Sequence, residues 1–242
     1  MESRTRGNVT INGTGTATGG YVDEVKINGA GTITSDLDCI NFTCNGTSDV
    51  KGAVKAERIR INGTTSIQGH VNADKIQVHG TIDVSGNLAF KEVVVNGSCD
   101  IGGMVSGESM EIQGSVSIAQ DCEVELFTGK GGFTIDGLLN AGTIDFQLYG
   151  KARAREIGGE TITIRIGKMF GLNKLIKSFF GGAHELRADV IEGDEIFLEN
   201  TRAKVVRGKN IAIGEGCEID EVEYTGTLNI HDDAKVRSYK AV

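Results

Sequence analysis

Proline is absent from this chain of 242 residues. Average usage would give roughly 12 prolines in a chain of this length. Since proline has no backbone N–H, it is excluded from the interior of a hydrogen-bonded ladder. Its absence therefore predicts a chain that forms β-ladder along almost all of its length. Tryptophan is also absent and aromatic residues make up only 5%, which indicates a narrow core without bulky rings.

Other absences limit the class of protein. No stretch approaches about 18 consecutive apolar residues, so we expect no segment that spans a membrane. The first six residues are mostly charged and polar and lack the apolar run of a signal peptide. We therefore expect a cytoplasmic protein. The net charge of −8 argues against binding to nucleic acid, which requires a basic surface.

Glycine, by contrast, recurs at an almost constant interval in the first half of the chain. The interval in residue number is 16 once and then 17 five times, and each glycine ends a phrase such as Ile-Arg-Ile-Asn-Gly at 59–63. A fixed short period is the mark of a solenoid, in which one repeat cannot bury its apolar face alone. The seven glycines are Gly13, Gly29, Gly46, Gly63, Gly80, Gly97 and Gly114.

Apolar residues hold fixed positions relative to these glycines. They stand four and two residues before each glycine and four residues after it, and from the second repeat onward also eight residues after it, with mostly polar residues between. The local period of 2 predicts strands with one apolar side, about three in each coil. Asn-Gly pairs mark the turns, where we expect glycine because it tolerates positive φ. The predicted fold is all-β, a parallel β-helix with three faces and about 17 residues per coil.

The repeat loosens after Gly114. The phrase returns at Gly137 and Gly150, after intervals of 23 and then 13, and an insertion near 129–132 explains the longer interval. Alternation of apolar and polar residues resumes near the end of the chain. We expect regular coils over 1–166, an amphipathic insertion over 167–185 and less regular coils of the same solenoid over 186–242.

The insertion has a helical pattern. Its apolar residues recur at steps of three and four and its only charges are lysines, which predicts a short amphipathic helix. Such a helix either lies on an anionic membrane or a partner protein, or packs on a face of the solenoid. The candidate contact residues are Lys168, Met169, Phe170, Leu172, Leu175, Ile176, Phe179 and Phe180.

Motifs of catalysis are weak. The chain has no phosphate-binding loop, and its four histidines lack the spacing of a zinc or nucleophile site. No cysteine pair has the Cys-x-x-Cys spacing, and Cys44 and Cys122 fall in apolar columns, so we expect buried thiols. The apolar spacing does not fit hexapeptide acyltransferases, and no acidic or aromatic groove of the pectate-lyase kind is evident. We expect no catalytic residue, metal, cofactor or nucleotide.

The constant coil length, the Ile-x-Ile-Asn-Gly phrase, the missing proline and the length of the chain together resemble the bactofilins, which are polymer-forming bacterial cytoskeletal proteins. The match covers about 9–150, and 149–224 resembles a longer branch of that family found in Gram-positive bacteria. The resemblance implies a right-handed β-helix that polymerises end to end without nucleotide and scaffolds envelope, morphogenesis or motility machinery. Many members carry proline-rich tails and a short apolar N-terminal membrane motif. This chain has neither, so 168–180 is the candidate for membrane contact.

The end coils of a β-helix offer a physical route to a polymer. They expose unpaired backbone groups and an open apolar core, and such edges recruit another chain unless they are covered. We therefore expect a homo-polymer, or a co-polymer with a paralogous subunit. The alternative is a capped, soluble β-helix that binds a protein partner on one face. The candidate interface residues are Val9, Ile11, Leu228 and Ile230.

Overall fold

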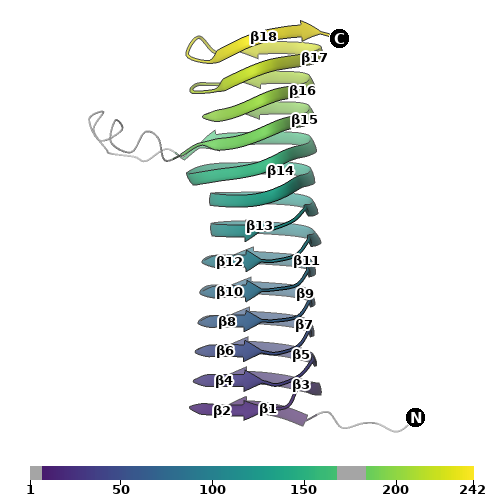
Figure 1. Ribbon diagram of the computed structural model, residues 1–242, viewed down its shortest axis with the longest axis vertical. Coiled ribbons are helices and arrows are strands. Elements are labelled where there is room, and N and C mark those ends of the chain that lie inside the picture. The colour runs from purple at the N-terminus through teal and green to yellow at the C-terminus, as the bar shows by residue number, and fades with distance from the viewer. Residues whose placement is uncertain (1–6, 168–183) are drawn as a thin grey trace, which may run out of the picture. The chain divides into compact units, whose positions relative to one another are not determined.

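The computed structural model describes residues 7–167 and 184–242. The chain divides into two compact units, Met1–Ala119 and Gln120–Val242. In each unit parallel strands are stacked coil upon coil (Figure 1). All the regular secondary structure of the described residues is strand. The prediction of an all-β parallel solenoid is confirmed, whereas the expected helical insertion lies outside the described residues.

Thirteen strands form the described part of the first unit, which begins at residue 7. They alternate between strands of four residues and strands of eight residues, with a short first strand and a long last one. The strands are β1 (Gly7–Ile11), β2 (Thr14–Ala17), β3 (Gly20–Ile27), β4 (Ala30–Ile33), β5 (Leu37–Cys44), β6 (Thr47–Val50), β7 (Val54–Ile61), β8 (Thr64–Ile67), β9 (Val71–Val78), β10 (Thr81–Val84), β11 (Leu88–Val95), β12 (Ser98–Ile101) and β13 (Val105–Ile118).

Each coil of the first unit has three straight segments. Strand β11 pairs with β9 so that partners differ by 17 in residue number, as in Leu88↔Val71. Lys91 and Asp74 are not paired in this register. At this point of β9 the two consecutive residues Asp74 and Lys75 are both exposed, which breaks the alternation of buried and exposed side chains. The long strand therefore bends at a corner, and the short strand supplies the third face. This confirms the predicted length of the coil and its three faces.

The glycine column is explained by close packing of the turns. Of its seven members only Gly13 has positive φ, at 115°. At Gly63 an added Cβ would stand 1.9 Å from the carbonyl oxygen of Gly46 in the coil before. From Gly29 to Gly114 the same distance is 1.9–2.2 Å. The expectation that positive φ selects these glycines is therefore wrong for six of them. Glycine is needed because the stacked turns approach too closely for a side chain.

An asparagine ladder runs beside the glycines. The Nδ2 of Asn28 donates to the Oδ1 of Asn12 at 2.6 Å, and Asn45 and Asn62 continue the series at 2.8 and 2.7 Å. Each side-chain amide binds the same group one coil away, as in other stacked β-structures. His79 follows in the same column, and its Nδ1 lies 3.3 Å from the Nδ2 of Asn96.

The second unit has longer strands. They are β14 (Cys122–Ile166), β15 (Leu186–Leu198), β16 (Thr201–Ile213), β17 (Glu218–Ile230) and β18 (Lys235–Ala241). The difference in residue number between paired residues is 34 between β14 and β15, as in Ala152↔Leu186, and varies from 15 in Leu186↔Thr201 to 17 in Glu218↔Lys235 in the later coils. Three buried rings, Phe127, Phe133 and Phe146, pack with centroid distances of 5.0–5.8 Å in the core.

Candidate functional site

The first coil of the first unit has an unpaired edge. Among the described residues, β1 pairs only with β3, and β2 pairs only with β4. Val9 is half-buried, and Ile11 is buried though more exposed than Ile27 in the next coil. The two interface candidates of this coil therefore lie in core columns that only one coil covers.

This first coil also carries no charge. From Gly7 to Val22 every side chain is apolar, amide, hydroxyl or phenol, or is a glycine. Asn12 accepts from Asn28 and is the last described member of its ladder. A docking strand would meet backbone groups, a side-chain amide and the apolar columns, with no electrostatic preference for either sign.

The last coil of the second unit is incomplete. Strand β18 covers only the segment Glu218–Tyr224 of β17. The remaining segment, Thr227–Ile230, pairs with β16 below it and with no other described strand. Leu228 is half-buried, and Ile230 is 37% exposed. Both interface candidates of this coil therefore lie on its uncovered part.

Two further residues belong to the same open core. Val236 pairs with Ile219, and Tyr239 pairs with Val222. Both partners are buried core residues, yet Tyr239 is 62% exposed because no described coil lies over it. Val236 and Tyr239 were not among the predicted interface residues. The signal was present, since each residue number exceeds that of its partner by 17.

Charged side chains flank this open coil. Lys235 Nζ lies 3.0 Å from Glu218 Oε1, and Lys240 Nζ lies 2.7 Å from Glu223 Oε1. The hydrogen bond to Lys240 lowers the pKa of the Glu223 carboxyl, and the hydrogen bond to Glu223 raises the pKa of Lys240. The partners therefore favour each other's charged forms, so both stay ionised at neutral pH.

The described residues form no cluster of side chains typical of a catalytic or metal-binding site. No group of three or more His, Cys, Asp or Glu side chains within 7–167 and 184–242 is arranged to hold a metal ion. The five cysteines are free and buried. Burial raises the pKa of Cys99 and of Cys122 to about 12, so these thiols are poor nucleophiles.

The candidate membrane or partner segment is not part of the described structure. Its residues, Lys168 to Phe180, lie outside the described residues, so their contact with a membrane stays a prediction. Within the part of the chain that the structure describes, no helix has the length and apolar character needed to cross a membrane.

Known proteins resemble the chain over different lengths. The family described as "Bactofilin: Polymer-forming cytoskeletal" matches residues 2–89. The uncharacterized protein YhbE of Bacillus subtilis (strain 168) is 51% identical over 230 residues, which cover 94% of this chain and 95% of that protein. The uncharacterized protein YhbF of the same organism is 46% identical over 225 residues, covering 93% and 92%. No solved structure matches the chain.

Proposed function

The chain belongs to the bactofilin family of polymer-forming cytoskeletal proteins, and on this premise we propose that it forms filaments by contact between end coils. Assembly needs no nucleotide in this proposal. The filament serves as a cytoplasmic scaffold that recruits envelope, morphogenesis or motility machinery. The family is a structural one, which is in keeping with the predicted lack of enzymatic activity.

The observation that carries the proposal is the pair of incomplete coils. In the first coil the columns of Val9 and Ile11 are covered by a described coil on one side only. In the last coil Leu228 and Ile230 lie on the uncovered segment of β17. Each coil therefore combines an unpaired strand edge with incompletely covered apolar side chains. Contact with another copy would pair the backbone groups and bury these side chains.

Electron microscopy of the purified full chain without nucleotide tests the proposal. We expect filaments from the wild type and their loss from Ile230→Glu, because that change places a carboxylate in the buried contact. Leu126→Glu is the matched control. Leu126 has the same 37% exposure as Ile230 but lies in β14, which belongs to neither end coil. Monodisperse monomers of the wild type across salt and pH, or intact filaments of Ile230→Glu, would overturn the proposal.

Co-polymerisation with a paralogous subunit is the second candidate. Its support is that one organism, Bacillus subtilis, has two proteins similar to this chain along almost their full lengths. The test is co-sedimentation of this chain with a second family member from its own organism. The two chains should pellet together at concentrations at which neither pellets alone. Independent pelleting of each chain would argue against co-polymerisation.

Membrane contact through 168–180 completes the proposal. The support is the sequence alone, in which six apolar residues recur at helical spacing between lysines. A filament would multiply a weak contact of this kind through multivalency. The scaffold would then lie at the inner face of the cell membrane.

A further inference from the structure

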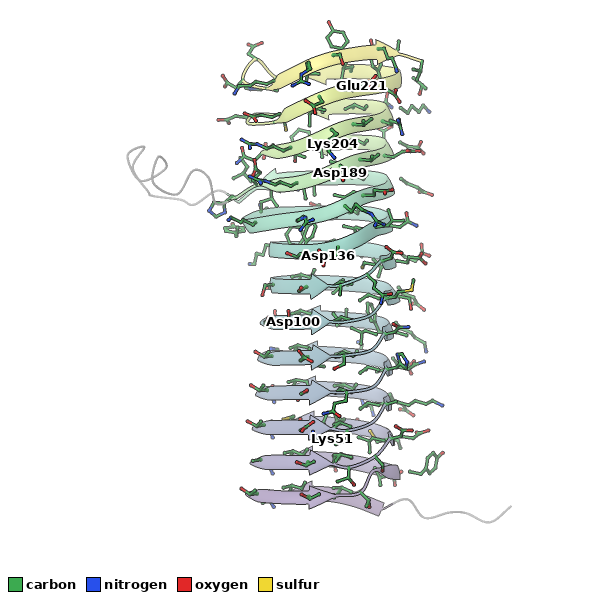
Figure 2. The ribbon with its side chains drawn as sticks, viewed as in Figure 1. Lys51, Asp100, Asp136, Asp189, Lys204 and Glu221 are labelled. Atoms are coloured by element: carbon green, nitrogen blue, oxygen red, sulfur yellow. The ribbon has the colours of Figure 1, made fainter. Side chains whose placement is uncertain are left out.

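Three columns of charged side chains run across successive coils of the second unit. The sign alternates from coil to coil in two of them; in the remaining column, Arg187 is in register with Arg202, and both contact Glu185. In the column of Asp189 and Lys204, shown in Figure 2, the Lys204 Nζ lies 2.8 Å from the Asp189 Oδ1. The three columns are Glu185–Arg202–Glu218–Lys235, Asp189–Lys204–Asp220–Arg237 and Glu192–Arg207–Glu223–Lys240.

A cation inside a column has an acid on each side. The Nε of Arg202 lies 2.6 Å from Glu185 Oε1 and 3.2 Å from Glu218 Oε2. The guanidinium of Arg207 likewise contacts Glu223 and lies 4.0 Å from Glu192. Each cation therefore joins the coil before it to the coil after it.

The final cation of each column has an acid on one side only. Lys235 contacts Glu218, and Arg237 Nη1 lies 3.5 Å from Asp220 Oδ1. Lys240 contacts Glu221 and Glu223. All these acids belong to β17. Strand β18 itself has no acidic residue, and no other described strand pairs with it. The free edge of β18 therefore presents three cations, each with a neighbouring coil on one side only.

We propose that β18 is a docking edge for an extended acidic segment of a partner protein. The segment would add as a strand and place carboxylates opposite Lys235, Arg237 and Lys240, which stand at positions i, i+2 and i+5. The acids Glu218, Asp220 and Glu223 have the same spacing on the strand that already pairs with β18. A docked strand would thus repeat on the free edge the charge pattern that β17 supplies on the other edge.

Charge complementarity favours an acidic segment over a second copy at the free edge of β18, so the two would compete for this coil. The first coil of another copy has no charged side chain between Gly7 and Val22, so it supplies no carboxylate. Strand β18 of another copy would set its own three cations against these, and like charges at close range are unfavourable. An acidic strand bound to β18 would cap the same open coil that the proposed filament contact uses.

A labelled peptide with the sequence Glu-Ile-Asp-Glu-Val-Glu-Tyr, that of residues 218–224, probes this edge in the full chain. The control peptide carries Glu→Gln and Asp→Asn at all four acids. Fluorescence anisotropy at low salt should show the acidic peptide binding about tenfold more tightly, since three exposed charge pairs each contribute a fraction of that preference. The preference should vanish at 1 M salt, where the Debye length is about 3 Å.

Variants of the full chain locate the binding. Lys235→Gln with Arg237→Gln and Lys240→Gln should remove the preference for the acidic peptide. The matched control neutralises three exposed lysines of the first unit, Lys26, Lys51 and Lys55, and should retain it. Circular dichroism verifies that both variants keep their strand content.

Equal affinity for the two peptides, no binding of the acidic peptide, or an unchanged preference in the β18 variant would each overturn the inference. Electron microscopy of the same samples keeps the two ideas separate. A chain that binds the acidic peptide but forms no filament would refute the filament proposal and leave the docking edge in place. A chain that forms filaments but binds neither peptide would do the opposite.

Discussion

The substitution Gly63→Ala tests directly whether the stacked turns approach too closely for a side chain. The new Cβ would stand 1.9 Å from the carbonyl oxygen of Gly46 and 2.8 Å from its carbonyl carbon. An ordinary carbon–oxygen contact needs about 3.3 Å, so the two turns would have to separate by more than about 1 Å. The groups in contact are backbone, which has no flexible side chain to move aside.

The same separation would weaken the ladder on both sides of the turn. Thr64 N donates to Gly46 O at 2.8 Å, and Asn62 N donates to Cys44 O at 2.8 Å. Forced overpacking costs about 1–3 kcal/mol, and each hydrogen bond contributes about 1 kcal/mol. We therefore expect Gly63→Ala to lower the free energy of unfolding by about 3–5 kcal/mol.

Gly150→Ala is the matched control, because its Cβ would meet no atom closer than 3.7 Å. We expect a change within about 1 kcal/mol, with a small gain from the lower entropy of the unfolded chain. Urea unfolding followed by circular dichroism, on dilute and unassembled protein, measures both variants. Hydrogen exchange at the amides of Asn62 and Thr64 locates the effect. A loss for Gly63→Ala no larger than that for Gly150→Ala would refute the explanation by close packing.

Two further predictions concern the buried thiols and the amphipathic segment. Burial raises the pKa of Cys99 and Cys122 to about 12, against about 8.5 in an unfolded chain. Their stabilisation is complete below pH about 8.5 and is lost as the pH rises toward 12, by about 1.4 kcal/mol per pH unit for each thiol. Urea unfolding between pH 7.5 and 10.5 should show this slope, and Cys99→Val with Cys122→Val should reduce it; an unchanged slope contradicts the assignment. For the amphipathic segment, we expect Leu175→Glu with Phe179→Glu to lower co-sedimentation with anionic liposomes, whereas equal binding would remove the membrane proposal.

The coil was predictable from the sequence because its length is almost constant in the first unit. A difference of 17 in residue number joins Leu88 to Val71 and Leu88 to Val105, so the same columns recur and can be counted. Alternation within each coil then gave the strands and their buried side. The reason for the glycine column was not predictable. Positive φ and close approach of two backbones both select glycine, and only coordinates distinguish Gly13 from Gly63.

The charge columns of the second unit could not be found by a fixed period. The residue numbers of Lys204 and Asp189 differ by 15, those of Arg207 and Glu223 by 16, and those of Arg237 and Asp220 by 17. No single spacing aligns these pairs, so in the sequence they look like an ordinary mixture of surface charges. Val236 and Tyr239, unlike the charged residues, could be found by a fixed period. Each follows its core partner, Ile219 or Val222, by 17 residues. The interface candidates from the sequence end at Ile230, before the coil that contains Val236 and Tyr239.

The first and last coils differ in the partners that they favour, because different side chains lack a neighbouring coil in each. A strand edge with apolar columns and no charge, as in the first coil, accepts any strand that can pair its backbone and cover Val9 and Ile11. In the last coil the backbone edge is similar, but Lys235, Arg237 and Lys240 add a preference for one sign of charge. Exposed ion pairs contribute little to stability individually, so the columns are better suited to selecting a partner than to holding the coils together. Self-association through the apolar residues of both end coils and recruitment of an acidic segment through the three cations of β18 therefore depend on different side chains, although both use the last coil.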